Sequence, residues 1–392
     1  MTRIPGSRFL HSPGPTHIPE EVLNAMHRQP MDHGDPRLDQ TIAAIETGIK
    51  RLLQTKASDL YLFAANGHGA WEATIENLVA PGQAILIPGT GHFSESWAAQ
   101  AEALGRRVVR TPIREGYPID ANDLENALRA DTKREIVAVF AVHTDTASSS
   151  TNDLAALRAA IDAAGHPALF AVDVVASLAA APFAMDALGA NVAVGATQKG
   201  LMSPPGMSFV AVDSRAGEIA ARNPAPRYYW DWGLRKADYS YRKFCGTPPQ
   251  NLLFGVEAAL ALLFLEGIDA VIARHAQLAR AVHAAVECWS SEGAVSFHCR
   301  VPAARSVSVT TIATLAGFDT EAMRTVARER FQVAIAGGLG PQTGRAFRIG
   351  HLGNLNSAMI LGCLAGVEAA MQVQKIPYGR GGMEAAIASL GK

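Results

Sequence analysis

Two residues that follow apolar segments, a lysine and an aspartate, could take part in chemistry in which an amine attacks an aldehyde. Lys199 lies just beyond the apolar run 192–195. A lysine at the end of a buried strand can be partly desolvated, which favours the neutral, nucleophilic amine. Asp173 directly follows the apolar run 168–172, where a carboxylate needs a cation or a polarised N–H group as its partner. Taken alone, Lys199 is also compatible with a solvated loop lysine, and Asp173 with the N-cap of a following helix.

A glycine-rich turn and an arginine could bind two anionic groups. Residues 65–72, Ala-Asn-Gly-His-Gly-Ala-Trp-Glu, connect the apolar run 60–64 to a predicted helix, whose N-terminal N–H groups favour phosphate. The turn matches neither a Walker loop nor a complete GxGxxG motif, so an ordinary turn is an alternative. Arg348 lies in a short apolar strand and can grip a carboxylate with two hydrogen bonds, unless it forms a structural ion pair. Together with the lysine and the acid, these groups are what pyridoxal phosphate chemistry on amino acids requires.

Alternating strands and helices must position these residues. Between residues 59 and 212, short apolar runs alternate with Ala-rich amphipathic segments, which is typical of a doubly wound α/β domain with a mostly parallel sheet. The predicted strands are 60–64, 84–87, 107–110, 136–142, 168–172, 192–195 and 207–212, and the predicted helices are 70–78, 94–104, 121–129, 154–164 and 185–189.

The rest of the chain predicts a smaller α+β domain. Residues 224–249 are rich in Pro, Tyr and Trp and are expected to be irregular. We therefore divide the chain into an N-terminal arm (1–16), a large cofactor-binding domain (17–255) and a small C-terminal domain (256–392). Beyond the irregular segment we expect helices at 252–265, 268–289, 320–330 (with Asp319 as its N-cap) and 357–373, and strands at 306–311, 333–335 and 346–349.

Composition excludes several classes of protein. The 392 residues include 35 basic and 36 acidic side chains, a balance that argues against a nucleic-acid-binding protein. The longer apolar stretches, such as 258–265, are about a third to a half of what a membrane span needs. The N-terminus lacks the apolar core of a secretory signal. Four cysteines without a CxxC pair predict neither disulfides nor a metal site. We expect a cytoplasmic protein.

The stretches that carry this chemistry match a known family along almost the whole chain. They are residues 13–16 (Pro-Gly-Pro-Thr), 67–73, 143–146 (His-Thr-Asp-Thr), 172–173, 198–202, 204–206 (Pro-Pro-Gly), 247–249 (Thr-Pro-Pro) and 347–353. On these motifs the sequence resembles the class V (fold-type I) aminotransferases, especially the serine–glyoxylate and alanine–glyoxylate branch.

The resemblance implies a role for each matching residue. Lys199 resembles the lysine that forms a Schiff base with pyridoxal 5'-phosphate and then shuttles the proton, and Asp173 the acid that pairs with the pyridine nitrogen. Arg348 resembles the arginine that holds the substrate α-carboxylate. The remaining matches are Gly67, His68 and Gln198 at the phosphate, Phe93 stacked on the ring, Thr146 at the phenolic oxygen, and Thr247 at the phosphate of the partner subunit.

A homodimer follows from the match at Thr247, and dimers could pair into tetramers. Simpler explanations exist for three of the matches. Phe93 could pack in the core, His68 could cap its helix, and Thr247 could be a turn residue before two prolines. The implied reactants are an amino acid and a 2-oxo acid.

Several residues on the expected pocket wall depart from the glyoxylate branch. Residues 143–149 read His-Thr-Asp-Thr-Ala-Ser-Ser where that branch commonly has His-Asn-Glu-Thr-Ala-Thr-Gly. His17 replaces an asparagine, Gly34 an arginine, and Val174 a glycine. The cofactor-facing residues are kept while the wall differs. We therefore expect transamination from a small L-amino acid, such as serine, alanine or an aspartate-like donor, to glyoxylate or another small 2-oxo acid.

Three other functions compete with this interpretation. A pyridoxamine–pyruvate transaminase would have an arginine at Leu339 and a cysteine at Gly200. A carbon–sulfur lyase or cysteine desulfurase would have a histidine at Gln198 and a mobile reactive cysteine, whereas Cys363 lies in an apolar helix pattern. A regulator without activity would not need the intact residues Lys199, Asp173 and Arg348.

Overall fold

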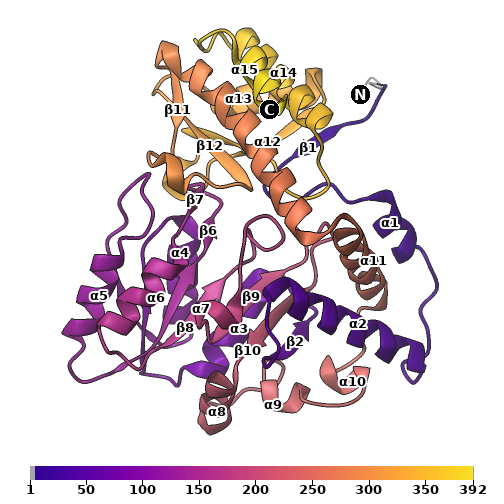
Figure 1. The fold of residues 1–392 in the computed structure, drawn as a ribbon, viewed down its shortest axis with the longest axis vertical. Coiled ribbons are helices and arrows are strands. Elements are labelled where there is room, and N and C mark those ends of the chain that lie inside the picture. Colours follow the sequence, from indigo (N-terminus) through magenta and orange to yellow (C-terminus); the bar gives the residue numbers. More distant parts are fainter. Residues whose placement is uncertain (1–4, 392) are drawn as a thin grey trace.

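A seven-stranded sheet forms the centre of the larger part of the computed structural model, which describes residues 5–391 (Figure 1). The strand order is β2-β10-β9-β8-β5-β3-β4; β10 runs antiparallel to both neighbours, and the other pairs are parallel. The predicted mostly parallel α/β sheet is therefore confirmed. Its strands are β2 (Asp59–Phe63), β3 (Ala84–Ile87), β4 (Arg107–Arg110), β5 (Ile136–Val142), β8 (Leu169–Asp173), β9 (Val192–Ala196) and β10 (Ser208–Val212).

Helices cover both faces of this sheet because its strands are apolar on both sides. In β2, for example, Leu60 and Leu62 face one hydrophobic core while Tyr61 and Phe63 face the other. Helices α2, α5, α6 and α11 contribute to the first core, and α3, α4 and α8 to the second. The helices of this part are α1 (Glu20–Met26), α2 (Pro36–Leu53), α3 (Gly67–Leu78), α4 (His92–Ala103), α5 (Ala121–Ala130), α6 (Leu154–Ala163), α7 (Met185–Leu188), α8 (Ser214–Arg222), α9 (Trp232–Arg235), α10 (Ser240–Lys243) and α11 (Gln250–Glu266).

A five-stranded sheet of order β1-β13-β14-β12-β11 and helices α12–α15 form the second part (Figure 1). The first strand comes from the N-terminus and pairs in parallel with β13, so the chain begins in the small sheet before it enters the large one. The elements are β1 (Phe9–His11), α12 (Ile268–Trp289), β11 (Val295–Phe297), β12 (Val309–Thr314), α13 (Thr320–Arg330), β13 (Val333–Gly337), β14 (Ala346–Gly350), α14 (Ser357–Val373) and α15 (Gly382–Leu390).

Two short strands link the large sheet to the small one. Strand β6 (Thr144–Asp145) and strand β7 (Ser150–Thr151) form an antiparallel hairpin directly after β5. The loop of this hairpin contacts β12, because the Thr311 hydroxyl donates to the Ala147 carbonyl at 2.9 Å. The hairpin therefore lies where the two sheets approach each other.

Most predicted elements of the second part agree with the structure. Helices 268–289, 320–330 and 357–373 are confirmed, and the Asp319 side chain caps α13 as predicted. The strand predicted at 306–311 begins only at Val309, because Ser306 and Ser308 hydrogen-bond to each other in a turn. The irregular segment 224–249 contains α9 and α10.

The division into domains stays a prediction. Its boundary between residues 255 and 256 would fall inside α11, and the arm predicted at 1–16 includes strand β1, with residues 1–4 outside the described part. Between residues 5 and 391, no helix has the length and apolar character that crossing a bilayer requires.

Candidate active site

A cavity of about 280 Å³ lies at the carboxyl ends of β8 and β9. Ligands of open α/β sheets bind at this edge. Its walls bring together seven of the nine predicted site residues: Gly67, His68, Phe93, Thr146, Asp173, Gln198 and Lys199. The other residues that line it are Gly14, Pro15, Asn66, Trp71, Thr144, Val175, Ala176 and Pro205.

Asp173 is the last residue of β8, and its side chain is almost fully buried. One carboxylate oxygen accepts the backbone N–H of Val175 at 2.6 Å, and the other accepts the indole N–H of Trp71 at 3.1 Å. Burial raises the pKa of Asp173 to about 7, although both hydrogen bonds and the charge of Lys199 oppose this rise. A cationic ligand group in the cavity would stabilise the ionised form.

Lys199 follows β9 and points at the N-terminal segment of the chain. Its Nζ donates to the carbonyl oxygen of Pro13 at 2.5 Å. Burial lowers the pKa of Lys199 to about 8, and the positive charge of Arg348 adds to this effect. A substantial fraction of the amine is therefore neutral near physiological pH, as a nucleophile towards an aldehyde must be.

The segment 12–16, which we call the strap, covers Lys199. Thr16 donates its backbone N–H to the Gln198 carbonyl at 3.2 Å and its hydroxyl to the Lys199 carbonyl at 3.0 Å. Gly14 has φ +129°, and a Cβ at this position would lie 2.4 Å from the Lys199 side chain. Only glycine fits both the backbone conformation and this close approach.

The N-terminus of α3 forms the wall where a phosphate is expected. The Asn66 side chain caps the helix by accepting the N–H of Gly69 at 3.3 Å, and a Cβ on Gly67 would lie 3.3 Å from Val175. The His68 ring contacts the Ser96 hydroxyl at 3.3 Å, and burial lowers its pKa, so it contributes no full charge. On the same cavity wall, Gln198 has a buried Oε1 that finds no partner within residues 5–391. Helix N–H groups and the helix dipole favour an anion here.

Asp145, one of the departures from the glyoxylate branch, organises the opposite wall. Its fully buried carboxylate accepts backbone N–H groups of Phe93 (2.7 Å), Ala147 (2.8 Å) and Ser148 (3.0 Å). These bonds tie the start of α4 to the β6–β7 hairpin. Asp145 thereby fixes the positions of Phe93 and Thr146, which both line the cavity.

Arg348 lies behind the cavity wall. From strand β14 its Nε donates to the Gly337 carbonyl at 2.7 Å, and its Nη1 donates to the carbonyl of Thr146, a wall residue, at 3.1 Å. Burial lowers its pKa to about 10, so it is cationic at neutral pH. Leu339, the position at which a pyridoxamine–pyruvate transaminase was expected to have an arginine, lines a neighbouring groove together with Arg348.

Thr247 is exposed and does not line the cavity of its own chain. It lies between α10 and α11. A role at the site would therefore require a second copy of the chain.

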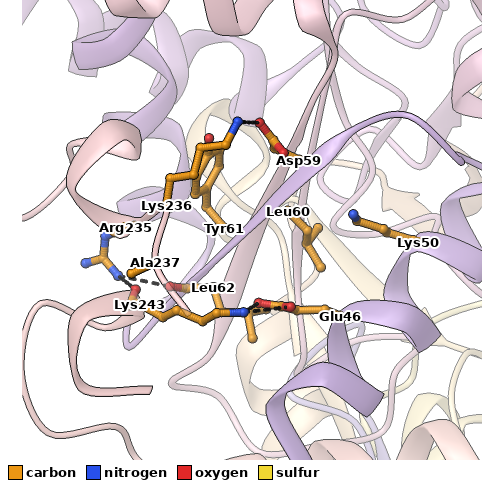
Figure 2. A pocket seen from close by; sticks show the side chains of 10 residues that line it. All are labelled: Glu46, Lys50, Asp59, Leu60, Tyr61, Leu62, Arg235, Lys236, Ala237 and Lys243. Carbon is orange, nitrogen blue, oxygen red and sulfur yellow. Dashed lines mark hydrogen bonds and ion pairs between the residues drawn. The ribbon is translucent and has the colours of Figure 1, made fainter. Parts of the chain in front are cut away.

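A second pocket, shown in Figure 2, lies between α2, β2 and the segment that contains α9 and α10. Its carboxylates are already paired: Lys243 contacts Glu46 at 2.7 Å, and Lys236 contacts Asp59 at 2.9 Å. Arg235 donates four hydrogen bonds to the backbone carbonyls of Tyr229, Leu62 and Lys243. These contacts indicate a structural role.

Trp71, Asn66 and Pro13 are site residues that the sequence analysis did not single out. Trp71 lies on the predicted helix 70–78. The observed α3 begins earlier, at Gly67, so Trp71 follows Gly67 by about one helical turn and shares its face. The contact of Pro13 with Lys199 joins residues 186 apart and left no local signal.

A family model described as "Aminotransferase class-V" matches residues 8–348. The chain belongs to the class V aminotransferase family. This class V aminotransferase is 37% identical over 372 residues to a serine–glyoxylate aminotransferase of Methylorubrum extorquens, with 94% of this chain and 92% of the relative covered. It is also 37% identical to an L-aspartate–glyoxylate aminotransferase of Paracoccus denitrificans, with coverage of 93% and 91%.

Solved structures confirm the fold-type I architecture of the class V aminotransferase. A pyridoxamine–pyruvate aminotransferase of Mesorhizobium loti superposes with a TM-score of 0.89 at 26% identity and covers 100% of this chain and 99% of its own. A ureidoglycine–glyoxylate aminotransferase of Bacillus subtilis superposes with a TM-score of 0.90 at 24% identity, and both chains are fully covered. The latter similarity concerns the fold alone.

Proposed function

We propose that this class V aminotransferase uses pyridoxal 5'-phosphate to move an amino group from a small L-amino acid to glyoxylate or another small 2-oxo acid. Donor and acceptor would react in turn at one site, in a ping-pong mechanism. The observation that carries the proposal is the partly neutral Lys199 amine in one cavity with the strand-end acid Asp173 and a helix N-terminus. Relatives named for glyoxylate support the choice of acceptor.

The residues of the cavity fit this cofactor. A buried carboxylate at Asp173 suits a protonated ring nitrogen, and the capped N-terminus of α3 suits the phosphate. The Gln198 amide, whose Oε1 has no partner within residues 5–391, would turn so that its NH2 group donates to the phosphate. When bound, pyridoxal phosphate supplies an aldehyde that condenses with amines and a ring that accepts electrons from Cα.

Each side chain then has a defined task. Lys199 would bond the cofactor covalently and, once released by the substrate amine, accept and return the Cα proton. Phe93 would lie against the ring and Thr146 would donate to its phenolic oxygen, so that the ring plane is fixed. Arg348 would hold the substrate carboxylate and thereby select which Cα bond stands perpendicular to the ring.

The walls that this chain supplies favour serine or alanine as donor. Thr144, Val175 and Ala176 are small or hydroxyl-bearing, and Lys199 is the one Lys or Arg among the lining residues of the described chain. The second carboxylate of an aspartate donor would need a cation from elsewhere, because a buried unpaired carboxylate is costly.

We also propose a homodimer that works in the cytoplasm, where four cysteines without disulfides are stable. Exposed aromatic residues lie on the segment before Thr247: Tyr228 is 75% exposed, Tyr239 52% and Tyr241 46%. Such a concentration is typical of an interface, and burying it against a second copy would bring Thr247 towards a partner site.

Profiling of donors and acceptors tests the proposed function. Cofactor-loaded protein should transfer amino groups from serine or alanine to glyoxylate faster than from aspartate, and Lys199→Ala should lose both the visible cofactor absorbance and turnover. Turnover of pyridoxamine with pyruvate, or sulfide release from cysteine, would instead support the competing functions. The desulfurase alternative lacks structural support, since Cys363 is fully buried in α14 and burial raises the pKa of its thiol.

Arg348→Lys tests the carboxylate-binding role. Lysine cannot form the two directed bonds to Gly337 and Thr146 and still present a planar pair of donors to the substrate. We expect kcat/KM to fall by about 10- to 100-fold, as for the loss of a charge-assisted hydrogen bond of about 1.5–3 kcal/mol. The absorbance of the bound cofactor should stay unchanged; loss of the cofactor in this variant would contradict the role.

A further inference from the structure

We propose that Trp71 is a positioning residue that fixes the plane of the Asp173 carboxylate and favours its ionised form. This inference rests on the proposed function, because the ionised carboxylate matters only if a cationic ring nitrogen binds beside it. Trp71 would touch neither reacting atom and would act through Asp173.

The contact joins two elements that are distant in sequence. The Trp71 indole on α3 donates to Oδ2 of Asp173 at the end of β8, across 102 residues. The backbone N–H of Val175 donates to Oδ1 at 2.6 Å. Two donors on two different oxygens restrain rotation about the Cβ–Cγ bond, so the carboxylate keeps one orientation towards the cavity.

The direction of the indole N–H is fixed by packing. The Trp71 ring stacks on Trp97 at 5.1 Å between centroids and 11° between planes, and Trp97 in turn lies 4.7 Å from Phe140. All three rings are essentially inaccessible to solvent. A large ring packed in this way cannot turn without breaking the core, and its N–H group therefore needs no reordering when a ligand binds.

One helix connects both ends of the expected cofactor. Gly67 and Trp71 are four residues apart on α3 and therefore lie on the same helix face. Gly67 opens the helix end expected at the phosphate, and Trp71 reaches the acid expected at the ring nitrogen. A rigid helix thus sets the distance between the two binding groups.

The hydrogen bond bears on the charge of Asp173 near neutral pH. Burial and the like charge of Asp145 favour the protonated acid, whereas Val175, Trp71 and Lys199 favour the carboxylate. Because these effects nearly balance around pH 7, removal of one donor should change the protonation state under physiological conditions. An indole N–H favours the charged form, since a protonated carboxyl group accepts hydrogen bonds less strongly.

Trp97 provides a matched control. It is stacked on Trp71 and equally buried, but its indole nitrogen has no hydrogen-bond partner in the described part of the chain. Trp71→Phe and Trp97→Phe therefore remove similar aromatic volume from the same core. Only the first removes a donor from Asp173.

The experiment measures the affinity of cofactor-free protein for pyridoxal phosphate between pH 6 and pH 9. In Trp71→Phe we expect the midpoint of the pH profile to move upward by about one unit, which lowers the affinity about fivefold at pH 7 and almost tenfold at pH 6, with recovery at pH 9. Trp97→Phe should keep the wild-type midpoint. An equal shift in both variants, or no shift in Trp71→Phe, would overturn the positioning role of Trp71. The proposed function would still stand in that case, provided that the wild type binds the cofactor. If the wild type binds no cofactor at any pH, both the positioning role and the proposed function are wrong.

A second measurement needs no Trp71 variant, so it tests the proposal even if Trp71→Phe does not fold. The chain has five tryptophans, whose indole N–H signals can be followed by NMR in the cofactor-free protein. One signal should move with pH as Asp173 titrates, and this movement should disappear in Asp173→Asn. If no indole signal follows the titration, the hydrogen bond does not sense the charge of Asp173 and the proposal is wrong.

Discussion

At the scale of single residues, burial brings the pKa values of Asp173 and Lys199 close together. The pKa of Asp173 rises from 3.8 to about 7, and that of Lys199 falls from 10.5 to about 8. The two charges also attract each other, which limits both shifts. The consequence is an acid and an amine that both change charge close to physiological pH, as expected of groups that bind and release a charged ligand.

The pH dependence of cofactor capture tests this arrangement. Capture needs the neutral amine of Lys199, so its rate should rise with pH and level off above about pH 8–9. Asp173→Asn removes a charge that stabilises the ammonium form, and the midpoint should then move to lower pH. The rate is measured by borohydride trapping of cofactor-free protein mixed with pyridoxal phosphate. A rate that still rises at pH 10 would indicate an ordinary lysine.

Single residues also show how far sequence reasoning reaches. Lys199 and Asp173 could be identified because each follows an apolar strand, and the ends of neighbouring strands meet at one sheet edge. Their contacts with Trp71 and Pro13 depend on the tertiary fold, because they join residues 102 and 186 positions apart, and no local pattern reveals them. The structural role of Asp145 was also hidden, since its three partners are backbone N–H groups.

At the scale of elements, four histidines, of which three are fully buried and His283 is partly buried, gather where the small sheet meets α12. His11 lies on β1, His275 and His283 on α12, and His351 directly after β14. The His283 and His351 rings are 6.0 Å apart, and the Gly353 N–H donates to His275 at 2.9 Å. Burial lowers the pKa of His11, His275 and His283 to about 4, and that of His351 well below its usual 6.5. These side chains are neutral in the folded protein.

These neutral histidines make the part of the chain around the small sheet and α12 sensitive to acid. Between pH 6.5 and 4 the unfolded chain binds more protons than the folded one, so stability is present above pH 6.5 and is lost as pH falls through this window. The buried Nε2 of His283 has no partner among residues 5–391, which makes this residue the best one to replace. The free energy of unfolding, measured in urea, should fall between pH 7 and pH 5 by about 2 kcal/mol less in His283→Phe than in the wild type.

The exposed residue His27 provides the control for this measurement. His27→Phe should lose stability between pH 7 and pH 5 to the same extent as the wild type. If His283→Phe also loses as much as the wild type, acid sensitivity arises elsewhere.

Elements differ in how well their own residues predict them. The strands of the large sheet are uniformly apolar because both faces are covered, and their predicted bounds differ from the observed ones by a residue or so. Helix α2 was not predicted, although Leu38, Ile42, Ile45 and Ile49 repeat with helical spacing and are all buried. Strand β1 is three residues long and is held by pairing with β13, a long-range contact that no local pattern reveals.

At the scale of the whole molecule, the strap and the β6–β7 hairpin connect the two sheets around the cavity. The strap runs from β1 of the small sheet to Lys199 beyond the large one, and Gly350 of β14 has no room for a side chain against the Ser12 carbonyl. The strap (Gly14 and Pro15) and the hairpin (Thr144 and Thr146), which both contact the small sheet, thus form part of the cavity wall. In the proposed dimer, Thr247 of a second copy would complete it.

Mixed dimers can show in which subunit Thr247 acts. Thr247→Ala alone should weaken cofactor affinity about tenfold or more, the effect of one hydrogen bond to a charged group. When Lys199→Ala and Thr247→Ala chains are mixed and allowed to exchange, a mixed dimer in which Thr247 serves the partner has one site with both residues intact. At a cofactor concentration that fills wild-type sites but not Thr247→Ala sites, such a mixture should regain up to about a quarter of wild-type activity, since half of the dimers are mixed and each has one intact site of two. If Thr247 serves its own chain, every site lacks one residue and mixing restores nothing; the same mixture with unexchanged chains is the control.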